Sequence, residues 1–166
     1  YQSQSQESIC TARKYFNQAK RIMHQLKSNE EYQSIINIGI SYLCENNPRL
    51  ALEYFECALG IMPSTLSFDI IKLKCNILIC KYLMNKQDVL SIREELLSLC
   101  TDAEELPDPW IKLLCIYNLY MLRDDDILAT NDLINNYPGD ANIYGLILKN
   151  PSVSSFMLGI SPHWRY

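Results

Sequence analysis

Residues 32–65 carry small and large apolar side chains at a spacing that fits two antiparallel helices joined by a short turn. Two helices pack closely only where small residues stand at their crossing, and this segment supplies three of them: Gly39, Ala51 and Ala58. Tyr42 and Phe55 are large enough to fill the remaining space between the helices. The pattern therefore predicts a tightly packed helical hairpin.

The segment resembles a tetratricopeptide repeat (TPR), whose consensus reads W-x2-L-G-x2-Y, then A-x3-F-x2-A, then P. Eight consensus positions fall within it: Ile35, Ile38, Gly39, Tyr42, Ala51, Phe55, Ala58 and Pro63. Seven of the eight match in type and spacing, and the exception is Ile35, which replaces the usual aromatic residue. The resemblance implies a protein that works by holding another macromolecule.

Repeats of this kind occur in arrays, because one helical hairpin cannot bury its own apolar face. Upstream, Ala12, Phe16 and Ala19 reproduce the A-x3-F-x2-A spacing of a second repeat helix. We therefore expect a helix over about 6–27 that lacks the first helix of its repeat, as in a fragment of a longer protein. Residues 1–7, with alternating Gln and Ser, predict a flexible lead-in.

Further helices are predicted after the hairpin, over residues 67–84, 88–100, 109–122, 124–137 and 141–149, with a last turn or two at 152–158. Asp88 is placed to cap the second of these, whose apolar stripe is Ile92, Leu96, Leu97 and Leu99. Asp108 and Pro109 form a cap and first-turn pair for the third.

The expected fold class is all-α, a TPR-like helical-repeat (α-α hairpin) right-handed superhelix of about seven or eight helices. A chain of 166 residues with 48% hydrophobic content can bury one continuous core, so we expect a single domain over residues 1–166. The chain contains no apolar run near 18 residues, which argues against a membrane span, and its polar start argues against a retained signal peptide.

Seven cysteines, an odd number, lie on predicted apolar helix faces. This predicts reduced core thiols in a cytoplasmic or nuclear protein. Cys75 and Cys80 are five residues apart in one predicted helix and could approach one another, but we interpret them as core thiols as well.

The sequence offers few residues for chemistry. Its two histidines, His24 and His163, have no zinc-ligand spacing, and no glycine-rich phosphate-binding or nucleophile-elbow motif occurs. The acidic run 124–126 lacks the spaced ligands and central glycine of a calcium loop, so we interpret it as the start of a helix. We therefore expect no catalytic residue, no metal, no cofactor and no enzymatic activity.

Charge is distributed unevenly along the chain. Residues 1–28 hold five basic residues and one acidic residue, whereas residues 101–140 hold nine acidic and two basic ones. The five basic residues form a candidate basic face that could meet an acidic peptide or phosphates, or else an ordinary solvated helix face: Arg13, Lys14, Lys20, Arg21 and Lys27. Without interleaved exposed aromatics, and with a net charge of -4, the chain does not favour nucleic acid as a partner.

The resemblance also implies a binding surface, because the first helix of each TPR unit lines a concave groove. Its nonconsensus positions, which would select the ligand, are Gln33, Ile36, Asn37, Ile40 and Leu43. Ile36 and Ile40 stand where chaperone-binding TPR domains place Lys and Asn, so a carboxylate clamp is not expected. The isoleucines would line an apolar groove for a helix or an extended peptide, or be covered by the superhelix itself.

Two interpretations of function follow. The favoured one is a noncatalytic protein–protein interaction module, an adaptor or scaffold segment of a multisubunit assembly that binds a protein or peptide. The alternative is a helical-repeat regulatory or substrate-recruiting arm of an enzyme complex, whose catalytic residues lie elsewhere in the full-length protein. Self-association through apolar helix faces is compatible with both.

Overall fold

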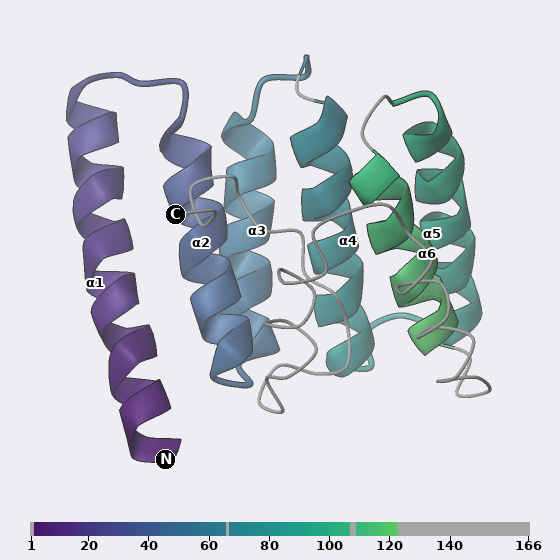
Figure 1. Ribbon diagram of the computed structural model, residues 1–166, viewed down its shortest axis with the longest axis horizontal. Coiled ribbons are helices and arrows are strands. Elements are labelled where there is room, and N and C mark those ends of the chain that lie inside the picture. The colour runs from purple at the N-terminus through teal and green to yellow at the C-terminus, as the bar shows by residue number, and fades with distance from the viewer. Residues whose placement is uncertain (1, 66, 107–108, 123–166) are drawn as a thin grey trace.

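The computed structural model describes residues 2–65, 67–106 and 109–122, and this part of the chain is all-α. Its six helices are α1 (Gln2–Gln25), α2 (Glu31–Cys44), α3 (Pro48–Ile61), α4 (Ser67–Leu83), α5 (Val89–Glu104) and α6 (Pro109–Met121). They follow one another in a row, each roughly antiparallel to the helix before it (Figure 1). The predicted all-α class is confirmed, and the helices predicted beyond residue 122 lie outside the described residues.

Local signals explain where several helices begin. Asn47 Oδ1 accepts a hydrogen bond from the Leu50 N–H at 3.2 Å, and Pro48 occupies the first turn of α3. Asp88 caps α5 as predicted, by accepting a hydrogen bond from the Leu90 N–H at 3.1 Å. The α5 helix continues to Glu104, past the predicted end near residue 100.

Three helices, α1, α2 and α4, are followed two positions after their last residue by a residue in the left-handed region, with φ values of 52°, 58° and 50° at Lys27, Asn46 and Asn85. The residue after each of these donates its backbone N–H to the carbonyl five positions earlier, at 2.9 to 3.0 Å. Such bonds satisfy carbonyls that the helix itself leaves unpaired. Asn enters this region more readily than most residues, so Asn46 and Asn85 favour the tight turns after α2 and α4.

The first helix begins earlier than expected. Residues 2–7 belong to α1, so the prediction of a flexible lead-in over residues 1–7 is wrong for this stretch. The Gln and Ser residues there include no Gly or Pro that would stop a helix. Extending an existing helix adds one hydrogen bond for each residue ordered, which favours its continuation.

The helix crossing predicted within the hairpin is confirmed. A Cβ atom built on Gly39 would lie 2.5 Å from Cε1 of Phe55, so only glycine fits at this point of α2. Ala51, Phe55 and Ala58 present no surface to solvent on the α3 side. As a result α2, which packs between α1 and α3, is the most thoroughly buried of the helices near it, with eleven of its fourteen residues buried.

The core continues through α4, α5 and α6. On α5 the buried positions are Ile92, Leu96, Leu99 and Ala103, which recur with the period of a helix. Leu97, predicted to share this stripe, is exposed, because one residue beyond Leu96 the helix has already turned by about 100°. No helix in the described ranges combines the length and apolarity that crossing a membrane requires.

Candidate binding surface

The five side chains predicted to line a groove lie along one side of α2 and are all buried. Their exposed fractions range from 3% for Asn37 to 9% for Gln33. The structure therefore brings Gln33, Ile36, Asn37, Ile40 and Leu43 together, as expected, but with almost no solvent contact. We refer to this set as the α2 face.

Two polar atoms within the α2 face lack a hydrogen bond. Among the described residues, Gln33 Oε1 and Asn37 Oδ1 are the buried side-chain oxygens that have no partner. An acceptor left unpaired in a protein interior costs about 1–3 kcal/mol. Because Gln33 and Asn37 are four residues apart, both oxygens belong to successive turns of the same side of the helix.

Three other polar groups on or beside the α2 face, from Gln33, Tyr32 and Ser41, form hydrogen bonds. The Gln33 Nε2 donates to Tyr32 Oη at 3.3 Å, and that hydroxyl donates to Asp69 Oδ2 on α4, also at 3.3 Å. Burial, assisted by the charge of Asp69, raises the pKa of the Tyr32 phenol, so it stays protonated at neutral pH. Ser41 Oγ donates to the Ile38 carbonyl at 2.6 Å. In the part of the chain that the structure describes, the amide oxygens of Gln33 and Asn37 are the buried side-chain acceptors left without a hydrogen bond.

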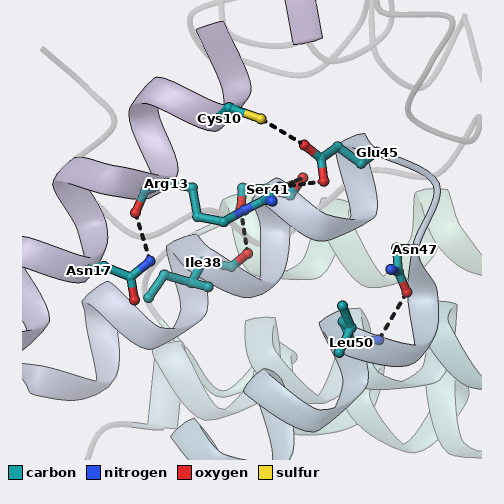
Figure 2. A network of polar contacts seen from close by, with 8 residues as sticks. All are labelled: Cys10, Arg13, Asn17, Ile38, Ser41, Glu45, Asn47 and Leu50. Carbon is teal, nitrogen blue, oxygen red and sulfur yellow. Dashed lines mark hydrogen bonds and ion pairs between the residues drawn. The ribbon is translucent and has the colours of Figure 1, made fainter. Parts of the chain in front are cut away.

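Arg13 joins α1 to α2 (Figure 2). Its Nε donates to Ser41 Oγ at 2.7 Å, its Nη2 donates to the Ser41 carbonyl at 3.1 Å, and Nη2 also forms an ion pair with Glu45 at 2.7 Å. The guanidinium lies 3.8 Å from the ring centroid of Tyr42, which stacks on Tyr54. Arg13 therefore holds two helices together and is not part of an open surface.

The predicted basic face is consequently wrong as a set of five. Lys14, Arg21 and Lys27 are exposed and Lys20 is partly buried, whereas Arg13 faces α2. Neighbouring positions on a helix point about 100° apart, so Arg13 and Lys14 cannot share one face. His24 is exposed, with its Nδ1 3.0 Å from Glu31 Oε2. His163 and the acidic run 124–126 lie outside the described residues.

A cluster of three thiols lies where α4, α5 and α6 meet. The Cys75 sulfur on α4 lies 3.5 Å from the Cys115 sulfur on α6. Cys75 therefore pairs with a thiol on another helix, and not with Cys80 in its own helix as the sequence allowed. The hydrogen bond with Cys115, together with burial, raises the pKa of Cys100. The hydrogen bond from Cys100 lowers the pKa of Cys115, but the bond with Cys75 and burial outweigh it and raise that pKa overall.

With their pKa values raised, the thiols of Cys100 and Cys115 are protonated at neutral pH and are therefore poor nucleophiles. All seven cysteines are free. Cys10 and Cys57 are exposed, so the prediction that every cysteine is a core residue is wrong for these two. Within the described ranges, no group of three or more His, Cys, Asp or Glu side chains is arranged to hold a metal ion.

The α2 face thus offers amide oxygens that accept hydrogen bonds and branched apolar side chains beside them. Amide groups do not titrate near neutral pH, so this surface is suited to recognition by hydrogen bonds and apolar contact. Comparison with protein-family models, curated proteins and solved structures finds no match to this chain.

Proposed function

We propose that this chain is a noncatalytic protein–protein interaction module, an adaptor or scaffold segment that binds an extended peptide through the α2 face. The observation that carries the proposal is the pair of buried acceptors, Gln33 Oε1 and Asn37 Oδ1, which receive no hydrogen bond. A ligand that supplies two donors removes the cost of both unpaired atoms and so stabilises the folded protein.

The finer architecture that we propose is a TPR-like right-handed superhelix. Its support is the antiparallel succession of the helices and the close crossing of Gly39 with Phe55. In an array of this type the first helix of a hairpin lines the concave side, which is the role that the proposal gives to α2. The free cysteines support a reducing compartment, the cytoplasm or the nucleus.

The spacing of the two acceptors favours an extended peptide over a helix as the ligand. Residues four apart on a helix differ in height by about 6 Å. In an extended chain, N–H groups two residues apart that point the same way are separated by about 6.6 Å. A ligand helix would have its own N–H groups already paired, apart from those of its first turn. Ile36 and Ile40 would contact apolar side chains of the peptide.

Because the α2 face is covered, the protein must open before a peptide can reach the two oxygens. Association is slower when binding requires a conformational change than when the binding site is preformed. We therefore expect an association rate below the usual range for protein–peptide pairs. The charged residues Lys14 and Arg21, which lie outside the α2 face, have a supporting role at most.

The proposal is tested by selecting binders from a phage library of random dodecapeptides and measuring synthetic copies by fluorescence anisotropy. We expect the selected peptides to bind the unmodified chain and to lose affinity for the Gln33→Leu variant, whose apolar side chain is one atom shorter and carries no acceptor. The control is Gln87→Leu, which changes a glutamine before α5, away from the α2 face.

Two outcomes would contradict the proposal. One is a selection that enriches no peptide. The other is a set of peptides that bind the unmodified chain and Gln33→Leu equally well, which would place recognition on a different surface.

A further inference from the structure

The three thiols at the junction of α4, α5 and α6 differ in their access to solvent. Each of these helices packs on the other two. Cys75 on α4 and Cys115 on α6 have no exposed surface, and their sulfurs are 3.5 Å apart. Cys100 on α5 forms a hydrogen bond with Cys115 and is partly exposed. We call these three residues the thiol cluster, which consists of a buried pair and one thiol that solvent reaches.

The buried pair is close to the geometry of a disulfide. A disulfide bond is about 2.05 Å long, so the sulfurs of Cys75 and Cys115, 3.5 Å apart, have to approach by about 1.5 Å. Rotation about each Cα–Cβ bond moves the sulfur, because it is the last heavy atom of its side chain. Since α4 and α6 already pack on each other, closure of the pair requires no rearrangement of the fold.

We propose that Cys75 and Cys115 are a site of oxidative modification, at which a peroxide converts the two thiols into a disulfide between α4 and α6. Cys100 is the thiol that meets the oxidant, because it is the member of the thiol cluster with surface in contact with solvent. One molecule of hydrogen peroxide takes up the two electrons that the reaction releases, so no other reactant is needed.

The reaction has three steps. The Cys100 sulfur, after losing its proton, attacks one peroxide oxygen; an S–O bond forms, the O–O bond breaks, and a sulfenic acid and water result. The Cys115 sulfur then attacks the Cys100 sulfur, an S–S bond forms, and the hydroxyl leaves with the Cys115 proton as water. Finally the Cys75 sulfur attacks the Cys115 sulfur, and Cys100 leaves as a thiolate that takes the Cys75 proton. The sum is two thiols and one peroxide converted into one disulfide and two waters.

The first step limits the rate. A thiol has to lose its proton before it attacks a peroxide, and the raised pKa of Cys100 makes the thiolate rare at neutral pH. Brief exposure to peroxide therefore leaves the thiol cluster reduced, whereas sustained exposure closes the disulfide. The new bond joins residues 40 positions apart and encloses α5 in a covalent loop. Such a loop restricts the unfolded chain, so oxidation stabilises this end of the row.

The test exposes the full chain, carrying Cys10→Ser and Cys57→Ser, to hydrogen peroxide for a long period. These two substitutions remove exposed thiols that would join separate copies. N-ethylmaleimide then blocks the remaining thiols, and mass spectrometry of a proteolytic digest identifies linked peptides. We expect a disulfide between Cys75 and Cys115 within the monomer and a higher melting temperature, both reversed by dithiothreitol. Circular dichroism verifies that the protein stays folded during the treatment.

The role of Cys100 is tested in the same background with Cys100→Ala. We expect this variant to form the disulfide at least about tenfold more slowly, since the oxidant then has to reach a thiol without exposed surface. The matched control is Cys80→Ala, which removes another thiol of α4 that has no exposed surface and lies outside the thiol cluster. It should leave the rate unchanged.

Two results would overturn the inference. The first is a folded protein in which prolonged exposure to peroxide yields no disulfide between Cys75 and Cys115, including one in which oxidation stops at Cys100. The second is a Cys100→Ala variant that forms the disulfide as fast as Cys80→Ala. The first result is obtained with the thiol cluster intact, so it decides the question even if Cys100→Ala fails to fold.

Discussion

Gly39 on α2 and Phe55 on α3 are in such close contact that a Cβ atom on Gly39 would lie 2.5 Å from Cε1 and 2.8 Å from Cδ1 of the phenylalanine ring. The ring has no free surface, so it cannot move away without displacing the core around it. This crossing sets the distance between α2 and α3. It thereby positions the α2 face relative to the rest of the row.

Gly39→Ala should lower the free energy of unfolding by about 1–3 kcal/mol, because the added methyl group overfills the crossing. Gly60→Ala is the matched control, since a Cβ there meets no atom within 4 Å. That substitution should raise the free energy of unfolding by about 0.5–1 kcal/mol, as alanine favours a helix. Urea unfolding measures both variants. A Gly39→Ala protein as stable as the unmodified one would show that the crossing is loose.

Arg13→Ala should lower the free energy of unfolding by about 1.5–3 kcal/mol, since it removes hydrogen bonds to Ser41 and the ion pair to Glu45 from a largely buried position. Arg13→Lys should restore little of this free energy, because an ammonium group cannot reproduce the planar arrangement of N–H donors in a guanidinium group. Lys14→Ala, an exposed neighbour, should change stability by less than about 0.5 kcal/mol. The loss of stability in Arg13→Ala should be accompanied by faster hydrogen exchange that is confined to α1. Equal effects of Arg13→Ala and Lys14→Ala on stability would contradict the role of Arg13 in holding α1 on α2.

Stability should fall at alkaline pH. Burial raises the pKa of the Cys80 thiol from 9.0 to about 12. Between these values the unfolded chain loses the proton while the folded protein keeps it, so the folded protein binds more protons and the free energy of unfolding declines as the pH rises. The stabilising contribution is complete below pH 9. Burial also raises the phenol pKa of Tyr54 and Tyr117, and these two groups further lower the free energy of unfolding as the pH rises above 10.

Urea midpoints between pH 7 and pH 11 measure this decline. Cys80→Ala should show a shallower dependence on pH than the unmodified chain, whatever its stability at pH 7. A midpoint that stays constant or rises from pH 9 to pH 11 would contradict the assignment of a buried, protonated thiol.

Local patterns in the sequence predicted much of the fold. The small residues of the hairpin, the Asp88 cap and Pro109 each act within a few positions of the element that they define, so the bounds of α4 and α6 agree with the structure to within a residue or two at either end. The role of Arg13 could not be predicted in this way. Its partners lie 28 and more residues away, and only the packing of α1 on α2 brings them together.

The candidate site was predicted only in part. The resemblance to a TPR unit predicted which residues form the α2 face. All of them belong to one helix, where positions three and four residues apart share a side. Burial of this face depends on contacts from other elements, which no local pattern encodes. The exposure of Leu97, in contrast, was available from the sequence, because it falls out of phase with Ile92, Leu96 and Leu99.

The central claim, that the α2 face keeps unpaired acceptors in order to bind a peptide, is tested most directly by Asn37→Leu with two readouts. Leucine has nearly the shape of asparagine and no unpaired oxygen, so the free energy of unfolding should rise by about 1–3 kcal/mol. Affinity for a selected peptide should fall at least tenfold, or by about 1.4 kcal/mol. Asn76→Leu is the control, since Asn76 is fully buried but has an interaction partner, and it should lose stability. An Asn37→Leu protein that gains stability and binds the peptide as well as before would contradict the account.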